Sequence, residues 1–130
     1  MEFAAPVPIL RMFDEHKARE FYLDYLGFEV VFEHRFEPGS PLYMGLSRGA
    51  CMLHLSGHHG DCAPGGAVRI AVDDLDGFRA QLRSKPYMYA RPAIEDTPWG
   101  TREMKIIDPF FNRVIFVDAR SNRPSAGDAA

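Results

Sequence analysis

The sequence contains few residues whose type and spacing could do chemistry. The densest group is the run His58-His59-x-Asp61-Cys62, whose imidazole, carboxylate and thiol groups are all possible metal ligands. Glycines flank this run, and a glycine-flanked loop is a poor rigid cage for an ion. A metal site in this loop therefore stays open as an alternative. The serines have no evident His–acid context, and we find no glycine-rich phosphate loop.

A second group of polar residues falls on alternating positions of strand-like segments. Side chains at every second position of a strand lie on one face, so alternation predicts which residues lie together. One predicted face has apolar members, including Ile115 and Val117, and five polar members: Arg11, His54, Arg69, Glu103 and Lys105. Enclosed charges need partners or a wet cleft that holds a ligand, whereas charges on an open face would simply be solvated. Glu103 beside Arg69 and Lys105 favours an ion pair over a general base.

The elements that would carry these residues occur in two similar halves. The first half predicts a strand over Val7–Met12, a helix that starts after Asp14, and strands over Glu29–Phe36, Leu42–Ser47 and Ala50–Leu55. The helix has an apolar stripe and ends at Gly27, with the stripe formed by Ala18, Phe21, Tyr22, Tyr25 and Leu26. On the last strand we expect Cys51, Leu53 and Leu55 in the core.

The second half repeats this order. It predicts a strand over Val68–Val72, a helix capped by Asp73 or Asp74 and ended by Pro86, and strands over Tyr87–Ala90, Thr101–Ile107 and Arg113–Val117. Asp108-Pro109 followed by Asn112 indicates a tight turn between the last two strands. We therefore expect a first module at 1–56, a linker at 57–66, a second module at 67–119 and a disordered tail at 120–130.

Composition excludes several functional classes. The net charge of −3 gives no basic surface for nucleic acid, which we do not expect as a partner. Two cysteines, Cys51 and Cys62, do not form a disulfide framework, and Met1–Leu10 lacks the features of a secretory signal. No apolar run is long enough to span a membrane. A cytoplasmic protein with free thiols is the expectation.

Four motifs in this order resemble the vicinal oxygen chelate superfamily, which contains glyoxalase I, extradiol dioxygenases and bleomycin-resistance proteins. They are Phe13-Asp14, Phe21-Tyr22-x-x-x-Leu26-Gly27-Phe28, Val72-Asp73-Asp74-Leu75 and Asp108-Pro109-x-x-Asn112. The segments Arg48-Gly49, Leu53-His54-Leu55-Ser56 and Pro98-Trp99-Gly100-x-Arg102-Glu103 look like the bleomycin-resistance branch. The resemblance covers roughly residues 5–118. Phe110-Phe111 departs from the small residue, often glycine, that is usual in this turn.

The resemblance implies an α+β fold of two tandem βαβββ modules that form a curved mixed sheet with helices on the outer face. Enzymes of the superfamily hold a divalent ion at positions that match Val7, Met52 or His54, Ala67 and Ile115. Three of these four positions carry aliphatic side chains, which cannot ligate a metal. We therefore expect no metal, no cofactor and no catalytic residues.

The resemblance also implies a homodimer whose crevices stack aromatic side chains on a drug. Trp99, beside Pro98 and Gly100, could line the mouth of a groove, and Phe32, Phe36 and Tyr43 are the other aromatic candidates. Arg11, His54, Arg69, Glu103 and Lys105 would supply polar contacts. The predicted function is metal-independent sequestration of a glycopeptide-type antibiotic such as bleomycin, an aromatic or cationic ligand, without modification. Two alternatives remain: a metal-dependent enzyme with a non-standard site, and a protein-binding immunity or regulatory partner.

Overall fold

The computed structural model describes residues 1–121, which divide into two compact units. The first unit contains Met1–Ala67 together with Asp108–Asn112, and the second contains Val68–Ile107 and the chain that follows from Arg113. No helix within residues 1–121 has the length and apolar character that crossing a membrane would need.

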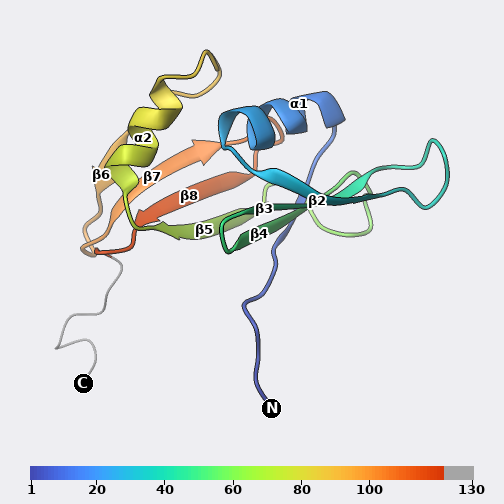
Figure 1. The fold of residues 1–130 in the computed structure, drawn as a ribbon, viewed down its shortest axis with the longest axis horizontal. Coiled ribbons are helices and arrows are strands. Elements are labelled where there is room, and N and C mark those ends of the chain that lie inside the picture. The colour runs from blue at the N-terminus through green and yellow to red at the C-terminus, as the bar shows by residue number, and fades with distance from the viewer. Residues whose placement is uncertain (122–130) are drawn as a thin grey trace. The chain divides into compact units, whose positions relative to one another are not determined.

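The first unit is a βαβββ module (Figure 1). Its strands β1 (Ile9–Arg11), β2 (Glu29–His34), β3 (Tyr43–Arg48) and β4 (Cys51–Ser56) form one sheet in the order β1-β4-β3-β2. β1 runs parallel to β4, whereas β2, β3 and β4 are joined as antiparallel neighbours. The register shifts between Val30 and Phe32 of β2, so this strand is irregular at its centre.

The first helical segment follows its sequence signals closely. Asp14 caps α1 (Glu15–Arg19) by accepting a hydrogen bond from the Lys17 amide at 2.9 Å. The chain then widens into η1, a π-helical segment over Glu20–Tyr25, and Gly27 follows with a φ of +79°. The predicted apolar stripe is fully buried: Ala18, Phe21, Tyr22, Tyr25 and Leu26. This stripe, with Leu53 and Leu55 of β4, belongs to the core of the first unit.

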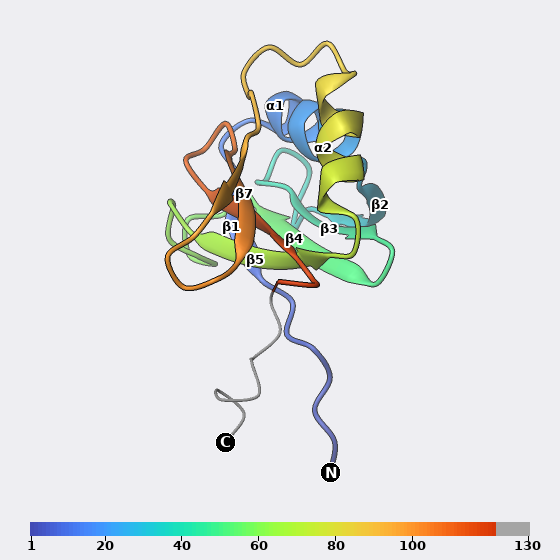
Figure 2. The same ribbon diagram turned by 90° about the vertical axis from the view of Figure 1, so that its left-hand side faces the viewer.

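The second unit repeats the same topology (Figure 2). Its strands are β5 (Ala67–Val72), β6 (Ile94–Asp96), β7 (Arg102–Ile107) and β8 (Arg113–Asp118), in the order β5-β8-β7-β6. The helix α2 (Leu75–Arg83) is capped by Asp74 and buries Leu75, Phe78 and Leu82. The order of strands in the two sheets is the same, which confirms the predicted α+β fold of two tandem βαβββ modules.

The Asp108–Asn112 turn is held by the buried carboxylate of Asp108. Its Oδ1 accepts from the amides of Phe110 and Asn112, both at 2.8 Å, and its Oδ2 accepts from the Tyr22 hydroxyl at 2.7 Å. The Asn112 side chain donates to the Arg11 carbonyl at 2.7 Å. Phe111 has a φ of +68°, a left-handed conformation that glycine adopts without steric cost. The departure from a small residue in this turn is therefore accommodated by a strained Phe111.

Two expectations on secondary structure and burial are wrong, and a third residue is more buried than its position suggested. Tyr87–Ala90 forms no strand, and β6 begins only at Ile94. The antiparallel partner of β7 on this edge is Ile94–Asp96, which starts two residues after Pro92. Val117 does lie on the predicted face of β8, because it is paired in register with Glu103, but only 1% of it is exposed. Cys51 was expected in the core but is partly exposed.

The remaining differences concern ends of elements. β1 spans only Ile9–Arg11, β2 ends at His34 rather than Phe36, and β3, β4 and β8 each extend one residue farther than predicted. Arg120 and Ser121, assigned to the tail, form a turn in which their amides donate to Asp118 at 3.0 Å. The rest of the predicted tail, 122–130, lies outside the described residues.

Candidate functional site

Three of the predicted ligand-binding residues lie together on one face of the first sheet. Phe32, Gly45, His54 and Ile9 are paired in register across β2, β3, β4 and β1, and Tyr43 lies two residues from Gly45 on β3. The Phe32 ring stacks on Tyr43 at 6.1 Å and meets His54 edge-on at 5.2 Å. We call these three residues, Phe32, Tyr43 and His54, the aromatic platform.

Gly45 provides the space under this platform, and the sequence reasoning missed it. A Cβ at position 45 would lie 2.3 Å from Cε1 of Phe32, which is closer than any real contact. The ring therefore lies directly against the backbone of β3. A glycine inside an apolar strand pattern is the signal that could have indicated this close approach. Phe32 remains 40% exposed, so one surface of the platform is open to a ligand.

A hydrogen bond fixes two members of the platform. The Tyr43 hydroxyl and His54 Nδ1 are 2.7 Å apart. Burial raises the pKa of Tyr43, and the nearby negative charge of Asp61 adds to the effect, so the hydroxyl keeps its proton at neutral pH. When Tyr43 donates to Nδ1, a neutral His54 ring carries its proton on Nε2 and can donate it to a ligand.

Arg11 lies on the same face of the first sheet, but it lines a separate pocket. Its partner in the register is Ser56, two residues beyond His54 on β4. Its guanidinium lies 4.7 Å above the Phe13 ring, and within residues 1–121 its buried Nε has no hydrogen-bond partner. The pocket measures about 610 Å³ and is lined by Arg11, Phe13, His59, Gly60, Asp61, Cys62, Ala63 and Pro64. The Arg11 guanidinium and the Phe13 ring together could bind a flat, polar group of a ligand.

A polar cluster occupies the corresponding face of the second unit. Arg69 of β5 donates two hydrogen bonds to Glu103 of β7, at 3.2 and 2.7 Å, and Thr101 donates a third at 2.6 Å. β8 lies between these two strands, and its Val117 is paired with Glu103. The ion pair therefore crosses β8 at Val117, which explains why that side chain is buried.

These contacts determine the chemistry of Glu103. The Arg69 guanidinium lowers the pKa of the Glu103 carboxyl most, and hydrogen bonds from Thr101 and Trp99 lower it further. A carboxylate with a lowered pKa is a weak base, so the geometry favours charge recognition over proton transfer. Trp99 is 69% exposed, so its indole can reach this carboxylate and still contact a ligand.

The other two predicted ligand-binding residues, Lys105 and Phe36, are exposed to solvent. Lys105 is exposed on the same face of β7 as Glu103, two residues farther along. Phe36 lies in the loop that joins β2 to β3 and projects beyond the sheet (Figure 1), with an exposed fraction of 86%. Their roles in binding stay predictions.

The possible metal ligands are spread over the structure. His58 and His59 stack on each other at 4.9 Å, while Asp61 accepts from the Ser56 hydroxyl at 2.6 Å. In the part of the chain that the structure describes, no three His, Cys, Asp or Glu residues are grouped to hold a metal ion. The side chains of Val7 and Ile115, two of the positions at which the resemblance implied metal ligands in superfamily enzymes, offer no donor atom.

A family match and similar solved structures agree on the proteins to which this chain is related. A family described as "Glyoxalase superfamily protein" matches residues 1–123. A bleomycin-binding protein solved in complex with bleomycin is 27% identical, with a TM-score of 0.69, and the match covers 88% of this chain and 98% of that one. A bleomycin-binding protein from Streptomyces verticillus, solved with copper(II)-bleomycin, is 31% identical, with a TM-score of 0.67 over 89% of this chain and 96% of that one.

A third solved structure extends the relationship. It is a bleomycin resistance determinant encoded on the transposon Tn5, 25% identical, with a TM-score of 0.67 over 88% of this chain and 97% of that one. No curated protein matches the chain. The matches span nearly the whole of each related chain, so they concern the complete fold and not a fragment of it.

Proposed function

Because this chain belongs to the glyoxalase superfamily, within its bleomycin-resistance-like branch, we propose that it binds an aromatic, cationic antibiotic of the bleomycin type and sequesters it unchanged. Binding would lower the free concentration of the drug, and no bond of the drug would be made or broken. The proposal includes a metal-independent site, a homodimer and a cytoplasmic location.

The observation that carries the proposal is the aromatic platform. An open ring at Phe32, supported by Tyr43 and His54, offers a flat surface on which a heterocycle can stack. His54 can add a directed hydrogen bond beside the stacked ring. The related bleomycin-binding proteins that were solved with bleomycin and with copper(II)-bleomycin support this choice of ligand.

The second unit offers complementary chemistry by itself. Glu103 stays ionised because Arg69 lowers its pKa, and Trp99 places an exposed aromatic ring next to that carboxylate. A negative charge beside an aromatic ring is suited to a cationic group. We propose that Trp99 and Glu103 contribute to affinity, as Phe32 does, and that the exposed Lys105 and Phe36 contribute less.

The first test is a calorimetric titration of chelator-treated protein with metal-free bleomycin, with copper(II)-bleomycin in a parallel arm. Saturable binding in the metal-free arm supports metal-independent sequestration. The ligand recovered afterwards should have an unchanged mass, since the proposal involves no chemical step. A modified product would instead indicate an enzyme, and binding only in the copper arm would contradict metal independence.

Variants test the residues that carry the proposal. Stacking contributes about 0.5–1.5 kcal/mol, so Phe32→Ala should weaken binding by about 2- to 13-fold. Trp99→Ala should also weaken binding while the fold stays intact. The matched control is Phe3→Ala, because Phe3 is an exposed phenylalanine outside the platform. Equal affinities for Phe32→Ala and Phe3→Ala would refute the assignment of the platform.

A further inference from the structure

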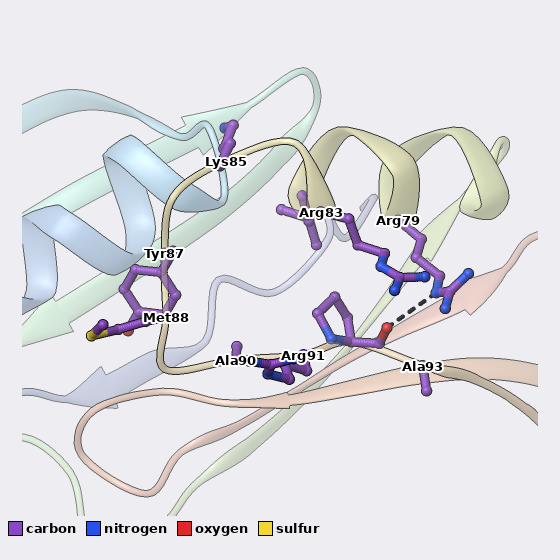
Figure 3. Close-up of a pocket in the computed structure, with 10 residues that line it drawn as sticks. Arg79, Arg83, Lys85, Tyr87, Met88, Ala90, Arg91 and Ala93 are labelled. Carbon is purple, nitrogen blue, oxygen red and sulfur yellow. Dashed lines mark hydrogen bonds between the residues drawn. The ribbon is translucent and has the colours of Figure 1, made fainter.

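A second pocket, with a different chemistry, lies beside the C-terminal half of α2 in the second unit (Figure 3). It measures about 360 Å³ and is lined by Arg79, Leu82, Arg83, Lys85, Tyr87, Met88, Ala90, Arg91, Pro92 and Ala93. Four of these residues are cationic and none is acidic, although the chain as a whole carries a net charge of −3. The local positive charge is therefore not a consequence of overall composition.

The helix and the following loop bring the cations together. Arg79 and Arg83 are four residues apart on α2, so they share one face of the helix, and Figure 3 shows both side chains extending from the helix toward the segment that carries Arg91 and Ala93. Nε of Arg79 donates to the Pro92 carbonyl at 3.0 Å, which holds this guanidinium against the loop. Its two Nη groups remain for another acceptor. Arg91 comes from the loop itself, directly before Pro92.

Carboxylates within residues 1–121 do not neutralise the charges of Arg83 and Arg91. Within residues 1–121, neither Arg83 nor Arg91 forms an ion pair. Asp76 feels the charge of Arg79, but its carboxylate is already bound by Arg102 through hydrogen bonds of 3.0 and 3.2 Å. The negative end of the α2 dipole favours a cation in the last helical turn, yet it does not account for Arg91 in the loop.

We propose that this pocket binds a small phosphate ester. Guanidinium groups donate pairs of hydrogen bonds that match the oxygens of a phosphate, and several converging cations suit a dianion better than a singly charged carboxylate. Tyr87 and Met88, at the rim of the pocket, would contact the organic part of the ester. The volume lies at the lower end of the range for ligand sites, which indicates a small molecule.

The experiment is a calorimetric titration in a phosphate-free buffer with three probes: inorganic phosphate, phenyl phosphate and benzoate. We expect saturable binding of phenyl phosphate, weaker binding of inorganic phosphate because it has no organic group, and binding of benzoate weaker than that of phenyl phosphate by about tenfold. Amide NMR shifts caused by phenyl phosphate should be confined to residues 79–93. Inorganic phosphate that binds as tightly as phenyl phosphate would overturn the assignment to an ester.

Variants distinguish binding in this pocket from non-specific attraction of anions to the protein surface. Arg83→Ala and Arg91→Ala should each weaken phenyl phosphate binding by about tenfold or more, since each removes a charged hydrogen-bond donor. Arg113→Ala is the matched control, because Arg113 is exposed at the start of β8 and lies outside the pocket. Shifts outside residues 79–93, no saturable binding, or an equal loss in Arg113→Ala would overturn the proposal.

Discussion

Removal of the Tyr22 hydroxyl tests how the Asp108–Asn112 turn is held. Tyr22 is fully buried, and its hydroxyl donates to Asp108 Oδ2 at 2.7 Å. The change Tyr22→Phe keeps the ring and removes only this donor. The carboxylate of Asp108 retains its bonds from the Phe110 and Asn112 amides and from the Asn112 side chain, so the turn should keep its shape.

The magnitude follows from the charge on the acceptor. A hydrogen bond to an ionised group contributes about 1.5–3 kcal/mol, so Tyr22→Phe should lower the free energy of unfolding by about 2 kcal/mol at neutral pH. For a chain of this size the expected fall in Tm is roughly 8 °C. Tyr89→Phe is the matched control, because the Tyr89 side chain is exposed and should lose almost nothing.

The pH dependence gives the sharper test. Burial raises the pKa of Asp108 above that of an unfolded aspartate, although its hydrogen bonds oppose the shift. Between the unfolded and folded pKa the native state binds more protons, so stability falls as pH rises through this window. Loss of the Tyr22 donor should raise the folded pKa further, since this donor stabilises the charged form.

The assay is therefore chemical denaturation of both proteins at a series of pH values. The difference in unfolding free energy between wild type and Tyr22→Phe should be largest above the folded pKa of Asp108 and should shrink below it. A difference that stays constant across the acidic range, or one below about 0.5 kcal/mol at neutral pH, would refute the reasoning.

Two further changes address backbone positions. Phe111→Gly should raise the free energy of unfolding by about 0.5–1 kcal/mol, because Phe111 holds a left-handed conformation at a φ of +68° and its ring is 79% exposed; an unchanged or lower Tm would contradict strain at this residue. Gly45→Ala should displace the Phe32 ring, whose Cε1 would lie 2.3 Å from the new Cβ. Because a ring can rotate away cheaply, we expect a nearly unchanged Tm with weaker bleomycin binding; wild-type affinity in this variant would show that the position of the ring does not matter.

Much of the fold was predictable from local patterns in the sequence. The stripe of the first helix, the Asp14 and Asp74 caps and the Asp108–Asn112 turn depend on residues that are near one another in the chain. Such signals operate before tertiary contacts form, which is why they indicate element type and order correctly. The predicted strand at Tyr87–Ala90 failed because a strand needs a partner that local alternation does not specify, and β7 pairs with Ile94–Asp96 instead.

In the candidate site, too, some features follow from the sequence alone and others only from the tertiary structure. By itself, the sequence determined which residue types were available: Phe32, Tyr43 and His54 on strands, with Trp99 and Glu103 near a turn. Their grouping required the register of β2 on β3, the shift between Val30 and Phe32, and the missing side chain at Gly45. Only the tertiary structure decided these features, because contacts between strands depend on pairing over long separations, whereas helix caps, apolar stripes and turns are set by neighbours within a few residues.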